Sequence, residues 1–293
     1  MRQGNSRLVL GFSQAVMNLP FRLANVESMK AAARRLNARL LVTDAKGSTA
    51  IEARNIRSLL DEGVDALIVS SLSGDAIYPA YREVIERRVP LIIFASGVPL
   101  DDTPYTSFVA PDEESMGRRA ARYVGTELEG EGKIVVLRGL PESTNSRLRS
   151  AGFSSELADE FPKIEIIGRG MGGWLRQPAR EFMEKLLPTV GRIDAVFAEN
   201  DEMALGVVDA LRLWRRGAET FVVGLDGQYE ALRRISEGSS FAMTIKSEWD
   251  GAAAVDAAVA AASRLEVPRR IVLDAPTINR TNVHEFLGKV RIW

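Results

Sequence analysis

Short apolar strands alternate with amphipathic helices along most of this chain, and this alternation limits the possible folds more than any other feature. The run Ala66-Leu67-Ile68-Val69-Ser70 is apolar almost throughout, and residues 89–94 form a second run of this kind. A helical segment over residues 77–87 lies between them. Strands without an apolar/polar alternation are typical of a parallel sheet that is covered by helices on both faces. The pattern therefore predicts an α/β fold.

The alternation is interrupted once and then restarts. It breaks at residues 99–104, which separates a block over about 8–108 from a second block over about 112–245. A length of 293 residues suits two domains of ordinary size. The Ala-rich helix over 249–263 is expected to return to the first block, and the tail from Ile271 to cross back. We therefore predict two doubly wound parallel-sheet lobes joined by a multi-strand hinge. The predicted N-terminal lobe is 1–110 plus 248–275, and the predicted C-terminal lobe is 111–247 plus 276–293.

Composition excludes several classes of partner. Lys and Arg number 38 and Asp and Glu 39, so the formal net charge is −1 and no basic footprint for nucleic acid is expected. No segment has the roughly 20 apolar residues that span a bilayer. Cysteine is absent, which excludes disulfides and thiolate sites but fits a cytosolic and a periplasmic location equally well. Residues 8–12 are too short for a signal-peptide core and are expected to form a strand, which leaves a cytosolic protein or a mature exported form.

Residues for catalysis are scarce. His284 is the only histidine, so a Ser–His pair or a histidine-based metal site is not expected. The triplet 112–114 is acidic but lacks a metal-ligand pattern, and we expect a solvated helix start there, with Asp112 at the first hinge crossing. We therefore predict a protein that is not an enzyme and that uses no metal and no cofactor.

A glycine-rich run imitates a dinucleotide-binding motif. Residues 168–173 fit the pattern G-x-G-x-x-G, and Asp194 follows about 20 residues later. In a true motif the acidic residue ends the next strand, whereas Asp194 precedes the strand 195–198. The helix is also expected to begin only at about Pro178, away from the glycines. An oxidoreductase with a bound nicotinamide or flavin is thus the weakest alternative.

Four segments resemble one known family. They are 18–21 (Asn-Leu-Pro-Phe), 139–153 with its G-x(7)-R-x-R-x-x-G-F pattern, 198–206 (Ala-Glu-Asn-Asp-Glu-Met-Ala-Leu-Gly) and 223–227 (Val-Gly-Leu-Asp-Gly). Together they resemble the type I periplasmic sugar-binding proteins of the ribose-binding kind, across essentially the whole chain. The same fold serves as the effector domain of regulators related to the lactose repressor.

The resemblance implies a ligand cleft between the lobes, lined by residues at the carboxyl ends of strands. Aromatic rings there cover the C–H faces of a sugar, and Asp, Asn and Arg bond its hydroxyls. Phe21 and Trp174 would be the two aromatic walls. The positions expected to bond the ligand in the second lobe are Arg147, Asn200 and Asp226, with Ser247 at the second hinge crossing. Asp201 is expected to be the N-cap of the following helix.

Three positions depart from the family pattern, all in the first lobe. Arg22 replaces a second aromatic, Ser96 ends a strand that often carries Asp-Arg, and Leu19 replaces an Asn. We include Arg22 and Ser96 among the predicted ligand-binding residues. Arg22 beside Arg147 would suit a carboxylate, so a sugar acid stands beside a pentose or a polyol as the expected ligand.

These features predict a solute-binding protein that closes over a small sugar, polyol or sugar acid and delivers it to an ABC-type importer. Its partners would be the carbohydrate and the membrane permease, and the protein would be a periplasmic monomer. The alternative is the effector domain of a transcription regulator, which would be cytoplasmic and dimeric. Such a regulator carries a helix-turn-helix of about 60 residues in front, and nothing before Arg7 resembles one.

Overall fold

The chain divides into two compact units. The computed structural model describes residues 7–18, 20–97, 105–247 and 251–288. The first unit is Met1–Pro111 with Glu248–Leu273, and the second is Asp112–Ser247 with Asp274–Trp293. The chain thus passes from one unit to the other after Pro111, after Ser247 and after Leu273. The predicted break at 99–104 and Leu19 lie outside the described residues.

The first unit is built on a six-stranded sheet in the order β11-β5-β4-β3-β1-β2, and every neighbouring pair is parallel. Its strands are β1 (Val9–Gln14), β2 (Arg39–Asp44), β3 (Ala66–Ser70), β4 (Leu91–Phe94), β5 (Ser107–Ala110) and β11 (Arg270–Val272). Its helices are α1 (Pro20–Arg35), α2 (Thr49–Asp61), α3 (Gly74–Glu86) and α9 (Ala252–Ala262).

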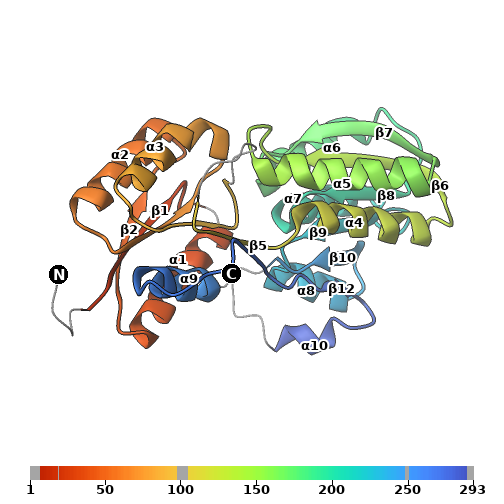
Figure 1. The fold of residues 1–293 in the computed structure, drawn as a ribbon. Coiled ribbons are helices and arrows are strands. Elements are labelled where there is room, and N and C mark those ends of the chain that lie inside the picture. Colours follow the sequence, from red (N-terminus) through yellow and green to blue (C-terminus); the bar gives the residue numbers. More distant parts are fainter. Residues whose placement is uncertain (1–6, 19, 98–104, 248–250, 289–293) are drawn as a thin grey trace. The chain divides into compact units, whose positions relative to one another are not determined.

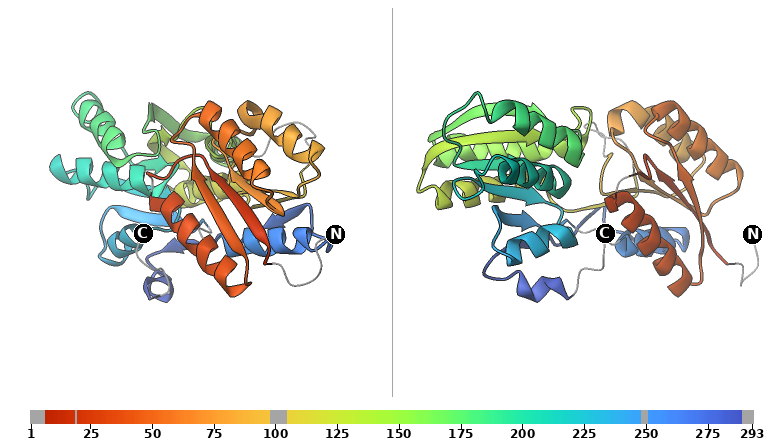
Figure 2. Two further views of the ribbon diagram at one scale, coloured as in Figure 1. Left: turned by 90° about the vertical axis from the view of Figure 1, so that its left-hand side faces the viewer. Right: turned by 180° about the vertical axis from the view of Figure 1, so that it is seen from behind.

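Helices cover both faces of this sheet because successive side chains of a strand point to opposite faces. In β3, Ala66 and Ile68 belong to the core formed with α1 and α9, whereas Leu67 and Val69 belong to the core formed with α2 and α3. Figures 1 and 2 show α1 and α9 side by side on one face and α2 with α3 on the other. This explains why the strand is apolar at each of these positions.

The second unit repeats the plan. Its sheet has the order β12-β10-β9-β8-β6-β7, parallel except that β12 runs antiparallel to β10. Its strands are β6 (Glu131–Arg138), β7 (Lys163–Met171), β8 (Ala195–Ala198), β9 (Phe221–Leu225), β10 (Phe241–Ile245) and β12 (Thr277–Asn279). Its helices are α4 (Glu113–Glu127), α5 (Thr144–Glu160), α6 (Arg176–Leu186), α7 (Asp201–Leu213), α8 (Tyr229–Ser236) and α10 (His284–Leu287). Helices α4 and α5 form one core with the sheet, in which the rings of Phe153 and Phe197 stack 4.0 Å apart.

The predicted fold class is confirmed, and the differences lie at element ends and in several short elements. Strand β7 continues to Met171, so Gly168 and Gly170 are strand residues and do not form a phosphate loop. These glycines allow close packing, because a Cβ on Gly170 would lie 2.6 Å from the ring of Phe182. Several short elements, α8, α10, β11 and β12, were not predicted, since segments of three to eight residues carry little periodicity.

Candidate ligand-binding site

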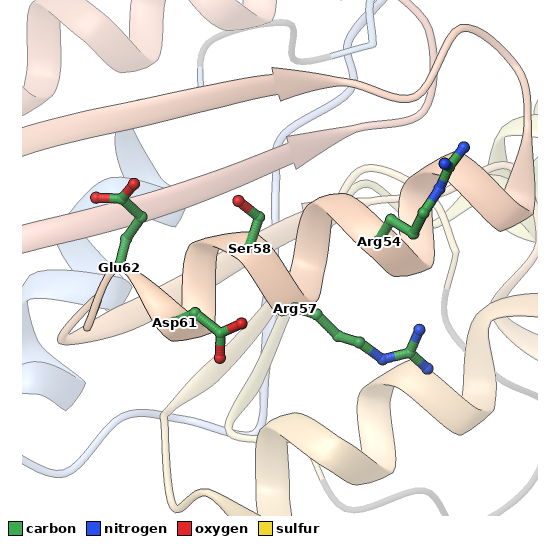
Figure 3. Close-up of a pocket in the computed structure, with 5 residues that line it drawn as sticks. All are labelled: Arg54, Arg57, Ser58, Asp61 and Glu62. Carbon is green, nitrogen blue, oxygen red and sulfur yellow. The ribbon is translucent and has the colours of Figure 1, made fainter.

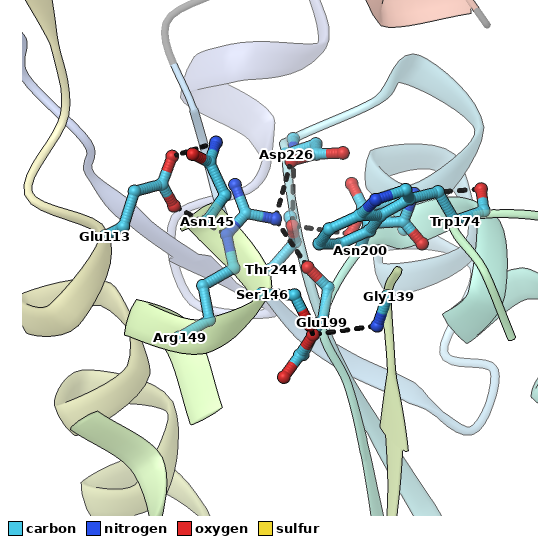
Figure 4. A network of polar contacts seen from close by, with 12 residues as sticks. Glu113, Gly139, Asn145, Ser146, Arg149, Trp174, Glu199, Asn200, Asp226 and Thr244 are labelled. Atoms are coloured by element: carbon cyan, nitrogen blue, oxygen red, sulfur yellow. Dashed lines mark hydrogen bonds and ion pairs between the residues drawn. The ribbon is translucent and has the colours of Figure 1, made fainter. Parts of the chain in front are cut away.

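Polar residues gather at the carboxyl ends of the strands in the second unit. Glu199 and Asn200 follow β8, and Asp226 follows β9. In parallel sheets these ends meet at one edge, where α/β proteins bind ligands. Glu113 from α4 and Arg149 from α5 also reach this edge (Figure 4). We call these five residues, together with Trp174, the Arg149 cluster.

Arg149 is the centre of this cluster. Its Nε donates a hydrogen bond to Oε2 of Glu113 at 2.5 Å, and its Nη1 lies 3.3 Å from Oδ1 of Asp226. Nη1 also donates to the backbone oxygen of Glu199. The side chain is only 5% exposed. Burial alone would lower the pKa of Arg149, but the carboxylates of Glu113 and Asp226 outweigh it and raise that pKa. The guanidinium is therefore permanently charged and fixed in orientation.

Asp226 is buried and conformationally strained. Its φ of 122° lies in a region that favours glycine, and such strain is found at functional sites in many proteins. Burial raises the pKa of Asp226 to about 7, Arg149 opposes this rise, and Glu113 adds to it. Ser247 lies next to Asp226, because the Ser247 backbone N–H donates to the backbone carbonyl oxygen of Asp226 at 3.1 Å. A buried carboxylate in this state gains from any further hydrogen-bond donor that a ligand supplies.

The N-cap of helix α7 is Asn200 and not Asp201, the residue predicted for this role. Asn200 is the N-cap of α7, since its Oδ1 accepts from the backbone N–H of Met203 at 2.9 Å. The prediction that Asp201 is the N-cap is therefore wrong. Asp201 is fully buried, and its carboxylate accepts from Thr244 Oγ1 at 2.7 Å and from the backbone of Gln228 at 2.8 Å. It ties α7 to β10 and to the turn after β9.

Asn200 also fixes Trp174. Its Nδ2 donates to the Trp174 backbone oxygen at 3.2 Å. The indole is nearly buried and packs on the backbone of Gly139, where a Cβ would lie 2.2 Å from the ring. The guanidinium of Arg149 lies 5.6 Å from the ring centroid. The ring thus packs on the backbone just after β6 and lies beside the polar cluster, and its contact with a ligand stays a prediction.

Glu113 and Glu199 were missed by the sequence interpretation. A solvated start was expected for residues 112–114, but Glu113 is only 4% exposed and binds Arg149, so that expectation is wrong for Glu113. Asp112 beside it is the N-cap of α4 and accepts from the Ser115 N–H at 3.0 Å. Glu199 is also buried and accepts from the Gly139 N–H at 2.8 Å and from the hydroxyls of Ser146 and Ser150. Burial raises the pKa of Glu199 against these donors.

Arg147 differs in position from Arg149. Residues two apart on an α-helix point about 200° apart, so the two arginines lie on opposite sides of α5. Arg147 is half-buried, and its Nη2 donates to Oγ1 of Thr144 at 3.5 Å. The pattern R-x-R thus offered two candidates, and it is Arg149 that the structure brings to Asp226. Contact of Arg147 with a ligand stays a prediction.

The first unit holds a second polar set at the carboxyl ends of its strands. Arg22, in the first turn of α1, is 7% exposed. Its Nη1 donates to Oε1 of Gln14 at 2.9 Å and to Oγ of Ser70, and its Nη2 donates to Oγ of Ser96 at 2.9 Å. The structure therefore brings together Arg22 and Ser96, two of the predicted ligand residues. Phe21 is half-buried against the core formed with α1 and α9, and its role as an aromatic wall stays a prediction.

A shallow hollow on α2 lies elsewhere in the first unit and is lined by charged residues. Arg54, Arg57, Ser58, Asp61 and Glu62 surround it (Figure 3). Arg57 pairs with Glu83 at 2.7 Å, and Asp61 pairs with Arg87 at 2.6 Å. Arg57 and Asp61 are therefore already paired and offer little to a ligand.

Comparison with known proteins identifies the family. Residues 10–265 match the family described as a periplasmic binding protein domain. The chain belongs to this family. It is 28% identical over 235 residues to the ribose import binding protein of Bacillus subtilis. This match covers 80% of this chain and 75% of the relative. It is also 28% identical over 263 residues to the xylitol-binding protein of Mycolicibacterium smegmatis, with 88% and 73% covered.

Solved structures agree with this family assignment. A solute-binding protein of an ABC transporter from Bacillus halodurans, solved with bound myo-inositol, superposes with a TM-score of 0.91 at 26% identity. The match covers 98% of this chain and 100% of that one. Among the residues that the structure describes, no helix is long and apolar enough to cross a membrane. The resemblance inferred from the four sequence segments is thereby confirmed.

Proposed function

We propose that this protein binds a small sugar or polyol, with a sugar acid as a further candidate, and delivers it to an ABC-type importer. The observation that carries the proposal is the Arg149 cluster. It offers a fixed guanidinium, a strained buried carboxylate and an amide at the edge of the sheet where α/β proteins bind ligands. The named relatives are binding proteins for ribose and xylitol, and the Bacillus halodurans structure contains myo-inositol.

The mechanism follows from the chemistry of hydroxyl groups. Each sugar hydroxyl both donates and accepts, so it can donate to Asp226 and accept from a neighbouring amide or guanidinium. We propose that the Arg149 cluster and the polar set around Arg22 contact the same ligand. A ligand bonded by both units stabilises the closed form over the open one. A ligand that lacks one hydroxyl leaves a buried group unpaired, at a cost of about 1–3 kcal/mol.

Location and partners follow from the same proposal. A protein that delivers solutes to an importer works in the periplasm, as a monomer, with the permease as its membrane partner. Its work is binding and release, and it catalyses no reaction.

The test is a thermal-shift screen against D-ribose, xylitol, myo-inositol and D-gluconate. At about 100 times Kd a ligand adds roughly 2.7 kcal/mol of stability, which raises Tm by about 4 °C in a chain of 293 residues. Asp226→Ala should abolish the shift, because it removes the acceptor beside Arg149. Asp159→Ala, an exposed site on α5, should leave it intact.

Two outcomes would count against the proposal. One is a panel in which no compound raises Tm. The other is a ligand whose shift is unchanged in Asp226→Ala, which would place binding away from the Arg149 cluster. A shift with D-gluconate alone would narrow the ligand to sugar acids.

A further inference from the structure

A buried chain of hydrogen bonds leads from Arg22 to Glu52 across the sheet of the first unit. Nη2 of Arg22 donates to Oγ of Ser96 at 2.9 Å, and Ser96 Oγ donates to the backbone oxygen of Ser71 at 2.6 Å. Oγ of Ser71 then donates to Oε2 of Glu52 at 3.0 Å. All four residues are at most 7% exposed. Arg22 comes from α1 and Glu52 from α2, so the chain joins the two helical layers of this unit.

The links of this chain have fixed directions. A serine hydroxyl has one proton, and because Ser96 gives it to the Ser71 oxygen, only its lone pairs are left for Arg22. The turn that carries Ser96 is also tight. Ala95 and Gly97 have φ values of 59° and 90°, and a Cβ on Gly97 would lie 2.7 Å from Cβ of Ser71. A displacement of Ser71 must therefore move Ser96, and with it the partner of Arg22.

Glu52 is the end of the chain whose state can change. The Ser71 hydroxyl has a second acceptor, the backbone oxygen of Ser73 at 3.3 Å, to which it can turn when Glu52 is protonated. Oε1 of Glu52 is buried without a hydrogen-bond partner among the described residues. Burial raises the pKa of Glu52 to about 7, although the bond from Ser71 and the charge of Arg22 oppose this.

Two ionisable groups on other helices interact with Glu52. Arg22 on α1 attracts its negative charge. Tyr81 on α3 stays protonated, because burial and the charge of Glu52 raise its pKa well above the usual value. Arg22 is therefore the charge that responds when Glu52 ionises.

We propose that Glu52 is a positioning residue for ligand recognition. In its ionised form it holds the Ser71 hydroxyl and, through Ser71 and Ser96, fixes the guanidinium of Arg22 for an oxygen of the ligand. This inference rests on the proposed function, because it takes Arg22 to contact the ligand. The affinity for the ligand then rises as Glu52 loses its proton, and protonation of Glu52 weakens the binding of the ligand by the first unit.

The test compares Glu52→Gln with the wild type, and Glu62→Gln, at the exposed end of α2, is the matched control. Calorimetry measures Kd for D-ribose, xylitol and myo-inositol at about pH 6 and about pH 8. The ratio of wild-type to Glu52→Gln affinity should rise about fivefold between these values, the lower end of couplings between sites. The ratio is used because the pKa of Asp226 is also raised to about 7 and acts equally in both proteins. Glu62→Gln should follow the wild type.

A second measurement needs no ligand. The NMR signals of the Arg22 guanidinium, assigned by their loss in Arg22→Met, should shift through about pH 7 in the wild type and stay constant in Glu52→Gln. Ser71→Ala breaks the chain but keeps Glu52, so it should reduce the shift of the Arg22 signals to the part that the charge of Glu52 causes through space. If none of the sugars binds, the proposed function is contradicted. The NMR measurement would still decide whether Glu52 positions Arg22. An affinity ratio that does not change with pH, or Arg22 signals that titrate alike in Glu52→Gln, would overturn this proposal.

Discussion

Replacing Arg149 by methionine tests the central claim about the second unit, namely that one guanidinium compensates two buried carboxylates. Glu113 and Asp226 would remain at 4% and 7% exposure without their cation. Breaking a buried ion pair from one side costs about 3–5 kcal/mol, because the remaining charge is desolvated and unpaired. Methionine keeps most of the side-chain volume, so this loss is electrostatic rather than a cavity effect. We therefore expect Arg149→Met to lose about 3–5 kcal/mol of unfolding free energy at about pH 7.5.

Urea unfolding followed by circular dichroism measures this loss, and Arg147→Met on the same helix is the control. The control should stay within about 1 kcal/mol of the wild type, since Arg147 is half-buried. In Arg149→Met the Asp226 carboxyl loses the charge that opposes the rise of its pKa, so the deficit should shrink as the pH falls and Asp226 becomes neutral. A deficit below about 1 kcal/mol, or one equal to that of Arg147→Met, would refute the reasoning.

Two further outcomes follow from the structure. The pKa values of Glu52 and Asp226 are raised to about 7, so between about pH 4.5 and about pH 7 the folded state binds protons that the unfolded chain releases. The free energy of unfolding in urea should therefore fall as the pH rises through this range. The expected loss for Glu52 alone is about 3 kcal/mol. Asp226→Asn should flatten this pH profile, and a profile parallel to the wild type would contradict the assignment. Gly152→Ala should destabilise the protein by about 1–3 kcal/mol or more, because the new Cβ would lie 2.0 Å from the Glu114 backbone oxygen where α4 and α5 pack. A change in the free energy of unfolding within about 0.5 kcal/mol would show that the two helices can separate freely.

The sequence predicts the architecture well because hydrophobic pattern is local. An unbroken apolar run such as residues 66–70 states by itself that both faces of its strand are covered. The same local logic located the strand ends that carry Asn200 and Asp226, since a polar turn after an apolar strand can be read from a few residues.

Partners far apart in the chain could not be predicted in this way. Glu113 looked like one more charge at a helix start, because nothing near it in the sequence indicates that Arg149 and Asp226 lie beside it. The N-cap of α7 was assigned to Asp201 instead of Asn200 for the same reason. Either residue suits an N-cap, and the choice depends on Thr244, which lies on another strand and binds Asp201.

Two of the three departures from the expected family pattern, Arg22 and Ser96, contact each other. The resemblance to the sugar-binding family implies Asp-Arg at the strand end where this chain has Ser96, and an aromatic ring where it has Arg22. Here the Arg22 guanidinium lies 2.9 Å from the hydroxyl of Ser96. A cation is thus delivered to the strand end from α1 instead of from the strand itself, and the short serine side chain leaves room for it. Because one change occupies the space that the other leaves, the effects of substituting Arg22 and Ser96 on ligand affinity should be non-additive in a double-mutant cycle, and strict additivity would show that the two departures are independent.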